Sequence, residues 1–237
     1  MTALVAFIIG LSKGGLGGLL GGLATPLMAL VMPADQVIGL LLPILMTADV
    51  FAVAMHWKRW DWRLVRLLVP GAVVGVTIAT LFIKNAPTST LKLALGIIVL
   101  IFALYRLFEP YLLHFFRYEA RNWHGSVAGT IAGFSSALAH TGGPPITIYL
   151  LMQKVTPSIF IATSAIFFMI VNWIKVPYYL YIGLFDFPRL LSLVWLAPVL
   201  PLGVWVGKWA GTRIDKTAFE RLVVILLVVT ALLLIFE

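Results

Sequence analysis

Two apolar segments of the chain are too long to be single straight membrane helices, and each is interrupted near its middle. They cover residues 2–32 and 125–153. A straight helix of about 30 residues measures ~45 Å, whereas the hydrocarbon core of a bilayer is ~30 Å thick. Seven glycines fall between residues 10 and 22, and the second segment contains His140-Thr-Gly-Gly-Pro-Pro145. Glycine and proline at that density end a regular helix, so we expect two half-helices in each segment.

Six further apolar segments complete the chain, at residues 37–55, 64–83, 88–108, 155–185, 190–207 and 217–236. Hydrophobic residues make up 62% of the sequence and charged residues 11%, which is typical of a protein whose surface faces lipid. The segments lack the alternation of β-barrel strands, so we predict an all-α integral membrane protein. No basic region precedes the first apolar stretch, and we expect no cleaved signal peptide.

The order of one interrupted segment and three ordinary ones occurs twice. Equivalent positions in the two copies are Pro33 and Pro157, Asp61 and Asp186, Gly75 and Gly203, and Leu91 and Phe219. We therefore predict two homologous membrane repeats, residues 1–115 and 124–237, joined by a linker at residues 116–123. The linker is too short to form a separate domain.

The basic residues favour one of two topologies. If the interrupted segments cross the membrane, the repeats are parallel and the basic residues divide eight to seven between the two sides. If each interrupted segment is a re-entrant hairpin, the second repeat is inverted and the division becomes twelve to three, with Lys13 and Lys175 inside the membrane. The positive-inside rule prefers the inverted repeat.

Four ionisable residues fall inside apolar segments, where each costs at least ~2.5 kcal/mol at the bilayer centre. They are Lys13, Asp49, His140 and Lys175. Lys13 and His140 lie in the two interruptions, beside backbone N–H groups that half-helix N-termini expose. We expect an oxyanion site near the midplane, built from Lys13, Gly14, Gly15, His140, Thr141, Gly142 and Gly143. The alternative is that Lys13 extends to the interface and the glycines serve helix packing.

Asn172 and Lys175 share one helical face because they are three residues apart, and Asp49 occupies the equivalent stretch of the second segment. Two interpretations stay open. Asp49 and Lys175 form a structural ion pair, or Asn172 and Lys175 bind substrate while Asp49 or His140 takes up a proton. Hydroxyl groups at Ser12, Thr25, Thr47, Ser135, Ser136 and Thr147 are further candidates for contacts to an anion, or for helix packing.

Several classes of function are disfavoured by what the sequence lacks. Cysteine is absent, so thiolate chemistry is excluded. The formal net charge of +8 is scattered between apolar runs, which argues against a nucleic-acid partner. No hydrolase, zinc-protease or Walker motif occurs, and we expect no enzyme activity, no catalytic residue, no cofactor and no metal.

The motifs Gly10-Leu-Ser-Lys-Gly-Gly, with Pro26 following, and Ala139-His-Thr-Gly-Gly-Pro-Pro145 resemble the signatures of the TauE/SafE sulfite exporter family. The resemblance covers nearly the whole chain. Thr141 stands where a smaller residue is expected. The resemblance implies a multi-pass secondary transporter of the cytoplasmic membrane that exports sulfite or small organosulfonate anions, coupled to protons. We expect transport by alternating access, and the alternatives are a passive anion channel and an intramembrane enzyme. The expected partners are a small sulfur-containing oxyanion and the lipid bilayer. Homo-oligomerisation is left open.

Overall fold

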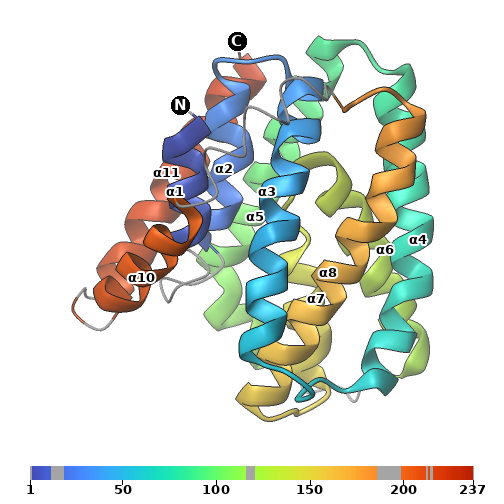
Figure 1. Ribbon diagram of the computed structural model, residues 1–237, viewed down its shortest axis with the longest axis vertical. Helices are drawn as coiled ribbons and strands as arrows, with labels where there is room; N and C mark the ends of the chain where they lie inside the picture. The colour runs from blue at the N-terminus through green and yellow to red at the C-terminus, as the bar shows by residue number, and fades with distance from the viewer. Residues whose placement is uncertain are drawn as a thin grey trace.

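The computed structural model describes residues 2–11, 19–115, 121–185, 199–211, 213 and 216–236. Lys13, Gly14, Gly15 and Asp186 lie outside these residues. The described part is helical and contains no strand (Figure 1). Its helices are α1 Thr2–Leu11, α2 Leu19–Ala29, α3 Ala34–Met55, α4 Trp62–Asn85, α5 Thr88–Phe115, α6 Asn122–Ala139, α7 Gly143–Met152, α8 Pro157–Tyr181, α10 Val199–Gly211 and α11 Lys216–Phe236.

Five of the described helices are long and apolar enough to cross a membrane. They are α3, α4, the part of α5 up to Glu109, α8, and α11 from Phe219. Large apolar side chains such as Ile78, Ile101, Leu104 and Ile225 are exposed on the outside of the bundle. A water-soluble protein rarely exposes so many, so this surface faces lipid. The predicted all-helical membrane protein is confirmed.

Helix boundaries follow from ordinary capping chemistry. Asp61 precedes α4 and its side chain accepts a hydrogen bond from the Arg63 backbone N–H at 2.8 Å. Thr156 precedes α8 and accepts from the Ile159 N–H at 3.5 Å, with Pro157 as the first helical residue. Such caps satisfy backbone donors that a helix start leaves unpaired.

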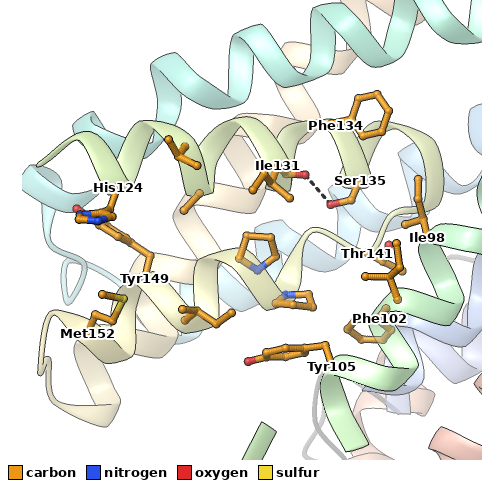
Figure 2. Close-up of a pocket in the computed structure, with 16 residues that line it drawn as sticks. Ile98, Phe102, Tyr105, His124, Ile131, Phe134, Ser135, Thr141, Tyr149 and Met152 are labelled. Atoms are coloured by element: carbon orange, nitrogen blue, oxygen red, sulfur yellow. Dashed lines mark hydrogen bonds between the residues drawn. The ribbon is translucent and has the colours of Figure 1, made fainter. Parts of the chain in front are cut away.

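The second interrupted segment folds back on itself between α6 and α7. Gly142, in the connection, packs against the carbonyl oxygen of Ala132, and the Tyr149 hydroxyl on α7 packs against Gly125 near the start of α6. The two helices therefore run antiparallel, and His124 and Met152 lie at the same end of the pair (Figure 2). The break falls at residues 140–142, where the sequence predicted it.

A glycine-lined contact between α4 and α6 joins the two halves of the chain. On α4, a Cβ at Gly71 or Gly75 would collide with the backbone of α6, at Ser126 and Thr130 respectively. Gly129 and Gly133 of α6 meet α4 equally closely, at Leu68 and Ala72. Because the residue numbers rise together on both helices, α4 and α6 run parallel and their backbones touch.

The corresponding contact in the other half of the chain joins α1 and α10. Gly203 packs against Phe7 and Gly10, and Gly207 packs against Leu11. These helices also run parallel. α4 thus packs against the first arm of the second interrupted segment, and α10 packs against the first arm of the first.

Candidate functional site

The connection between α6 and α7 brings the predicted polar residues of the second half to one place, which we call the hairpin tip (residues 136–143). His140 ends α6 in the left-handed backbone region, with φ 54°, and its N–H bonds the Ser136 carbonyl oxygen at 3.1 Å. Glycine is the usual residue in this conformation, although histidine tolerates it better than most residues. Because histidine occupies this position, where glycine is usual, an imidazole side chain lies at the break between α6 and α7.

Lys175 of α8 reaches the hairpin tip from the side and is fully buried. Its Nζ donates to the carbonyl oxygen and to the hydroxyl of Ser136, each at 2.8 Å. It also donates to Oδ1 of Asn172 at 2.9 Å, and Nδ1 of His140 lies 3.4 Å away. Three strong acceptors match the three protons of an ammonium group, so Lys175 is satisfied by the protein itself.

Asn172 connects Lys175 to Asp49 of α3. Its Nδ2 donates to Asp49 Oδ2 at 2.6 Å, while its Oδ1 accepts from Lys175. Asp49 is 1% exposed and Asn172 is 4% exposed. A carboxylate and an ammonium buried in one hydrogen-bonded chain balance each other's charge, which makes their burial affordable. The three residues predicted to act together are brought together.

The ring of His140 has a defined orientation. Nε2 lies 3.1 Å from the carbonyl oxygen of Ile38 on α3, and a carbonyl oxygen can only accept. Nε2 therefore carries the proton, and Nδ1, which faces Lys175, is the nitrogen with the lone pair. His140 thus links α3 and α8 across the end of α6.

Two side chains of α8 also satisfy carbonyl groups at the end of α6. Lys175 bonds the Ser136 carbonyl, and the Tyr179 hydroxyl donates to the Ala137 carbonyl at 2.7 Å. The Ser136 carbonyl already accepts from the His140 N–H, so Lys175 adds a second donor there. Tyr179, in contrast, supplies a donor to a carbonyl at a helix end, where backbone partners run out. A positive charge at this end also complements the helix dipole. Lys175 therefore has a structural role beside any role in transport.

The α7 side of the tip is short of backbone donors, because Pro144 and Pro145 carry no N–H group. The donors available at the start of α7 come from Thr141, Gly142 and Gly143, and the Thr141 N–H bonds the Ser135 carbonyl at 3.4 Å. Gly142 is packed tightly against α6 and Phe168, whereas no described residue lies within 4 Å of a Cβ placed on Gly143. Among the described residues of the tip, Gly143 thus leaves room for another molecule.

The structure separates Thr141 from the other predicted residues. Its side chain lines an apolar groove on the side of the hairpin that faces α5, and its hydroxyl has no hydrogen-bond partner in the described structure (Figure 2). Sequence reasoning also missed two participants, the Ile38 carbonyl and the Tyr179 hydroxyl. Tyr179 lies one helical turn after Lys175, and that spacing was the available signal.

Among the described residues, no group of His, Asp and Glu side chains is arranged to hold a metal ion. The described residues form two short antiparallel helices joined at a break, with a buried chain of polar side chains packed against that break. In polytopic membrane proteins this combination is typical of transporters, whose broken helices mark ion and substrate sites.

The family model for "Sulfite exporter TauE/SafE" matches residues 2–234. The chain belongs to the TauE/SafE sulfite exporter family, and it is accordingly a multi-pass membrane protein of a sulfite and anion exporter class. No curated protein and no solved structure matches it in the comparisons made.

Proposed function

We propose that this protein exports sulfite or a small organosulfonate across the cytoplasmic membrane by proton-coupled alternating access. Family membership supports the class of cargo. The observation that carries the mechanism is the buried chain of Asp49, Asn172, Lys175 and His140 at the hairpin tip. Buried ionisable groups inside a membrane protein are costly and usually belong to substrate or proton pathways.

The two halves are inverted repeats in this proposal, and both interrupted segments are re-entrant. Three observations support the arrangement. α6 and α7 run antiparallel, α4 runs parallel to α6, and α1 runs parallel to α10. If a hairpin opens each repeat, α1 and α4 point in opposite directions. A parallel pair of α4 and α6 then requires that α6 point opposite to α1, which is an inversion of the second repeat.

His140 couples proton binding to the position of Lys175. Nε2 is already protonated and faces the Ile38 carbonyl, so a second proton can bind only at Nδ1, which lies 3.4 Å from Lys175 Nζ. Two positive charges at that distance repel each other in a site shielded from water. Proton uptake by His140 therefore weakens the hold of Lys175 on the tip of α6. Asp49 balances the charge of Lys175 through Asn172 and is the second proton acceptor of the site.

The anion binds at the tip from the side of Gly143, where the structure leaves room. N–H groups of Gly142 and Gly143 are the donors on this hairpin. Lys13, Gly14 and Gly15 supply a positive charge and further donors from the other interrupted segment. Because the described acceptors already saturate Lys175, it supplies a fixed positive charge near the anion, and Asn172 holds it in place.

The test is sulfite flux in proteoliposomes loaded with a pH-sensitive dye, with and without an imposed pH gradient. We expect saturable flux that responds to the gradient and moves protons. His140→Ala and Lys13→Ala abolish flux, while His56→Ala and Lys58→Ala, the same substitutions in the loop after α3, leave it unchanged.

Two outcomes contradict the proposal. Flux that ignores the pH gradient and saturates weakly identifies a passive anion channel. Conversion of the anion by the protein in detergent, where no second compartment exists, identifies an enzyme.

A further inference from the structure

A second site lies on the opposite side of the hairpin from the polar chain. It is a cavity of about 760 Å³ between α5 and the α6–α7 hairpin, and we call it the lateral groove (Figure 2). Its walls are Ile98, Ile101, Phe102 and Tyr105 of α5, residues 124–135 of one face of α6, Thr141, and Pro144, Pro145, Ile148, Tyr149 and Met152 of α7.

The chemistry of the lateral groove does not suit the proposed cargo. Its lining is almost wholly aliphatic or aromatic, and His124 is the one side chain in it that can carry a positive charge. A small oxyanion needs several charged or polar donors and fills a small part of such a volume. The lateral groove therefore takes a long apolar ligand.

The depth of the lateral groove in the membrane follows from its ends. One end is at His124, whose ring stacks on Trp123 at 3.9 Å between centroids, and Trp123 is 60% exposed. Exposed tryptophan is typical of the interface between lipid and water. The other end is at Ser135 and Thr141, beside the hairpin tip. Eleven residues of α6 separate His124 from Ser135, a rise of ~17 Å, which is close to the ~15 Å hydrocarbon thickness of one leaflet.

The lateral groove is open toward the bilayer. Ile101 of α5 and Val127 and Ile131 of α6 line it, yet they are 61%, 46% and 53% exposed. A lipid chain can therefore enter sideways from its own leaflet without passing through the protein.

An exposed arginine lies next to the interfacial end of the lateral groove along the chain. Arg121 is exposed and lies one turn before His124, at the start of α6. Arg106, next to Tyr105 on α5, is bonded to Glu109 at 2.6 Å, so its charge is balanced within the protein. Nδ1 of His124 already accepts from the Arg121 N–H at 2.8 Å and its ring stacks on Trp123, so Arg121 is the described side chain that can pair with a negatively charged head group.

We infer that the lateral groove is a binding site for an anionic phospholipid, with one acyl chain between α5 and the hairpin and the phosphate at Arg121. The lipid fills the space that α5 leaves beside α7 and holds the hairpin at a fixed distance from α5. This inference is independent of the cargo and of proton coupling.

The test uses the full-length protein in detergent and native mass spectrometry, with phosphatidylglycerol and phosphatidylcholine of the same chain length as probes. We expect one bound phosphatidylglycerol per chain, retained at least tenfold better than phosphatidylcholine. Arg121→Gln removes the preference, while Arg59→Gln, a change at an exposed arginine in the loop after α3, keeps it.

Ala128 lies at the base of the lateral groove and is 9% exposed, so Ala128→Phe places a ring where the acyl chain would lie. We expect this variant to lose bound lipid of both kinds. Ala54→Phe, at an exposed alanine of α3, serves as the control and retains it. Equal retention of the two lipids, or phosphatidylglycerol bound equally well to Ala128→Phe, overturns the inference.

A second copy of the chain is the competing occupant. The native sequence has no cysteine, so Ile131→Cys introduces a single thiol beside the lateral groove. Efficient disulfide-linked dimers in native membranes contradict a lipid site, whereas monomers under the same oxidation agree with it.

Discussion

The two sides of the α6–α7 hairpin have opposite chemistry, although neighbouring residues build them. Ser136 and His140 face α8 and contact Lys175, while Ser135 and Thr141 line the apolar lateral groove next to α5. Successive helical residues point about 100° apart, so one step along α6 moves a hydroxyl from a charged site to a lipid-facing one. Polar residue types near a helix break therefore do not by themselves mark a substrate site. Which neighbouring helix they face decides their role.

The largest expected effect on the polar side comes from Lys175→Ala. The change removes the charge that balances Asp49 and leaves the Ser136 carbonyl without one of its donors. Breaking a buried charge pair by removing one partner costs about 3–5 kcal/mol. We expect a strong fall in melting temperature in detergent and no sulfite flux. The control is Lys84→Ala, because Lys84 is exposed and bonds only the Tyr181 hydroxyl among the contacts described, at 3.1 Å. Wild-type melting of Lys175→Ala would show that the polar chain does not stabilise the tip.

The two tip glycines provide the next contrast. Gly142→Ala places a Cβ 2.7 Å from the Ala132 carbonyl oxygen, and overpacking of this kind costs about 1–3 kcal/mol. The new Cβ of Gly143→Ala meets no described residue within 4 Å, so the melting temperature of this variant should match that of the wild type. Since Gly143 is where the anion is proposed to approach, we expect Gly143→Ala to lose flux while it remains folded. If both variants show normal flux and an unchanged KM for the anion, the anion binds elsewhere.

Two buried tyrosines allow the sides to be compared with one substitution. Tyr179→Phe, on the polar side, leaves the Ala137 carbonyl without its donor, and a buried unpaired group costs about 1–3 kcal/mol. Tyr149→Phe, in the lateral groove, removes a hydroxyl that has no hydrogen-bond partner in the described structure. We expect a lower melting temperature for Tyr179→Phe alone. Equal melting temperatures of the two variants would show that the tyrosine hydroxyl on the polar side stabilises the protein no more than the one in the lateral groove.

The smallest effect is expected at Thr141. Thr141→Val keeps the shape of the side chain and removes a hydroxyl that is buried and unpartnered. Burial of an unpaired hydroxyl costs about 1–3 kcal/mol in protein mutational data, so the melting temperature should rise slightly. Because Thr141 lines the lateral groove, we expect flux to be unchanged. Loss of flux in Thr141→Val would instead assign Thr141 to the anion site, as the sequence motif predicts.

The sequence predicted those parts of the fold that depend on local chemistry. Where the structure describes them, the apolar segments coincide with helices, and the break at residues 140–142 falls where proline and glycine cannot continue α6. The structure brings Asp49, Asn172 and Lys175 together, and this grouping could be seen in the sequence because helical spacing and intramembrane charge are visible there. The contact from Tyr179 to Ala137 and the lateral groove were not predictable, because both depend on where α8 and α5 lie against α6. The prediction of a site at Lys13, Gly14 and Gly15 stays a prediction, since these residues lie outside the described part of the chain.

The glycine contacts between α4 and α6 and between α1 and α10 determine whether each half of the chain can be stable as a separate polypeptide. The nearest partner of Gly71 and Gly75 is α6, in the second half of the sequence, and the nearest described partner of Gly203 and Gly207 is α1, in the first half. Neither half covers its own glycine-lined surface. If the halves were made as separate polypeptides, we expect each to be unstable alone and both to be rescued on co-expression. If the two repeats are inverted as we propose, a half-length chain that stood alone would have to insert in both orientations and pair with its own inverted copy.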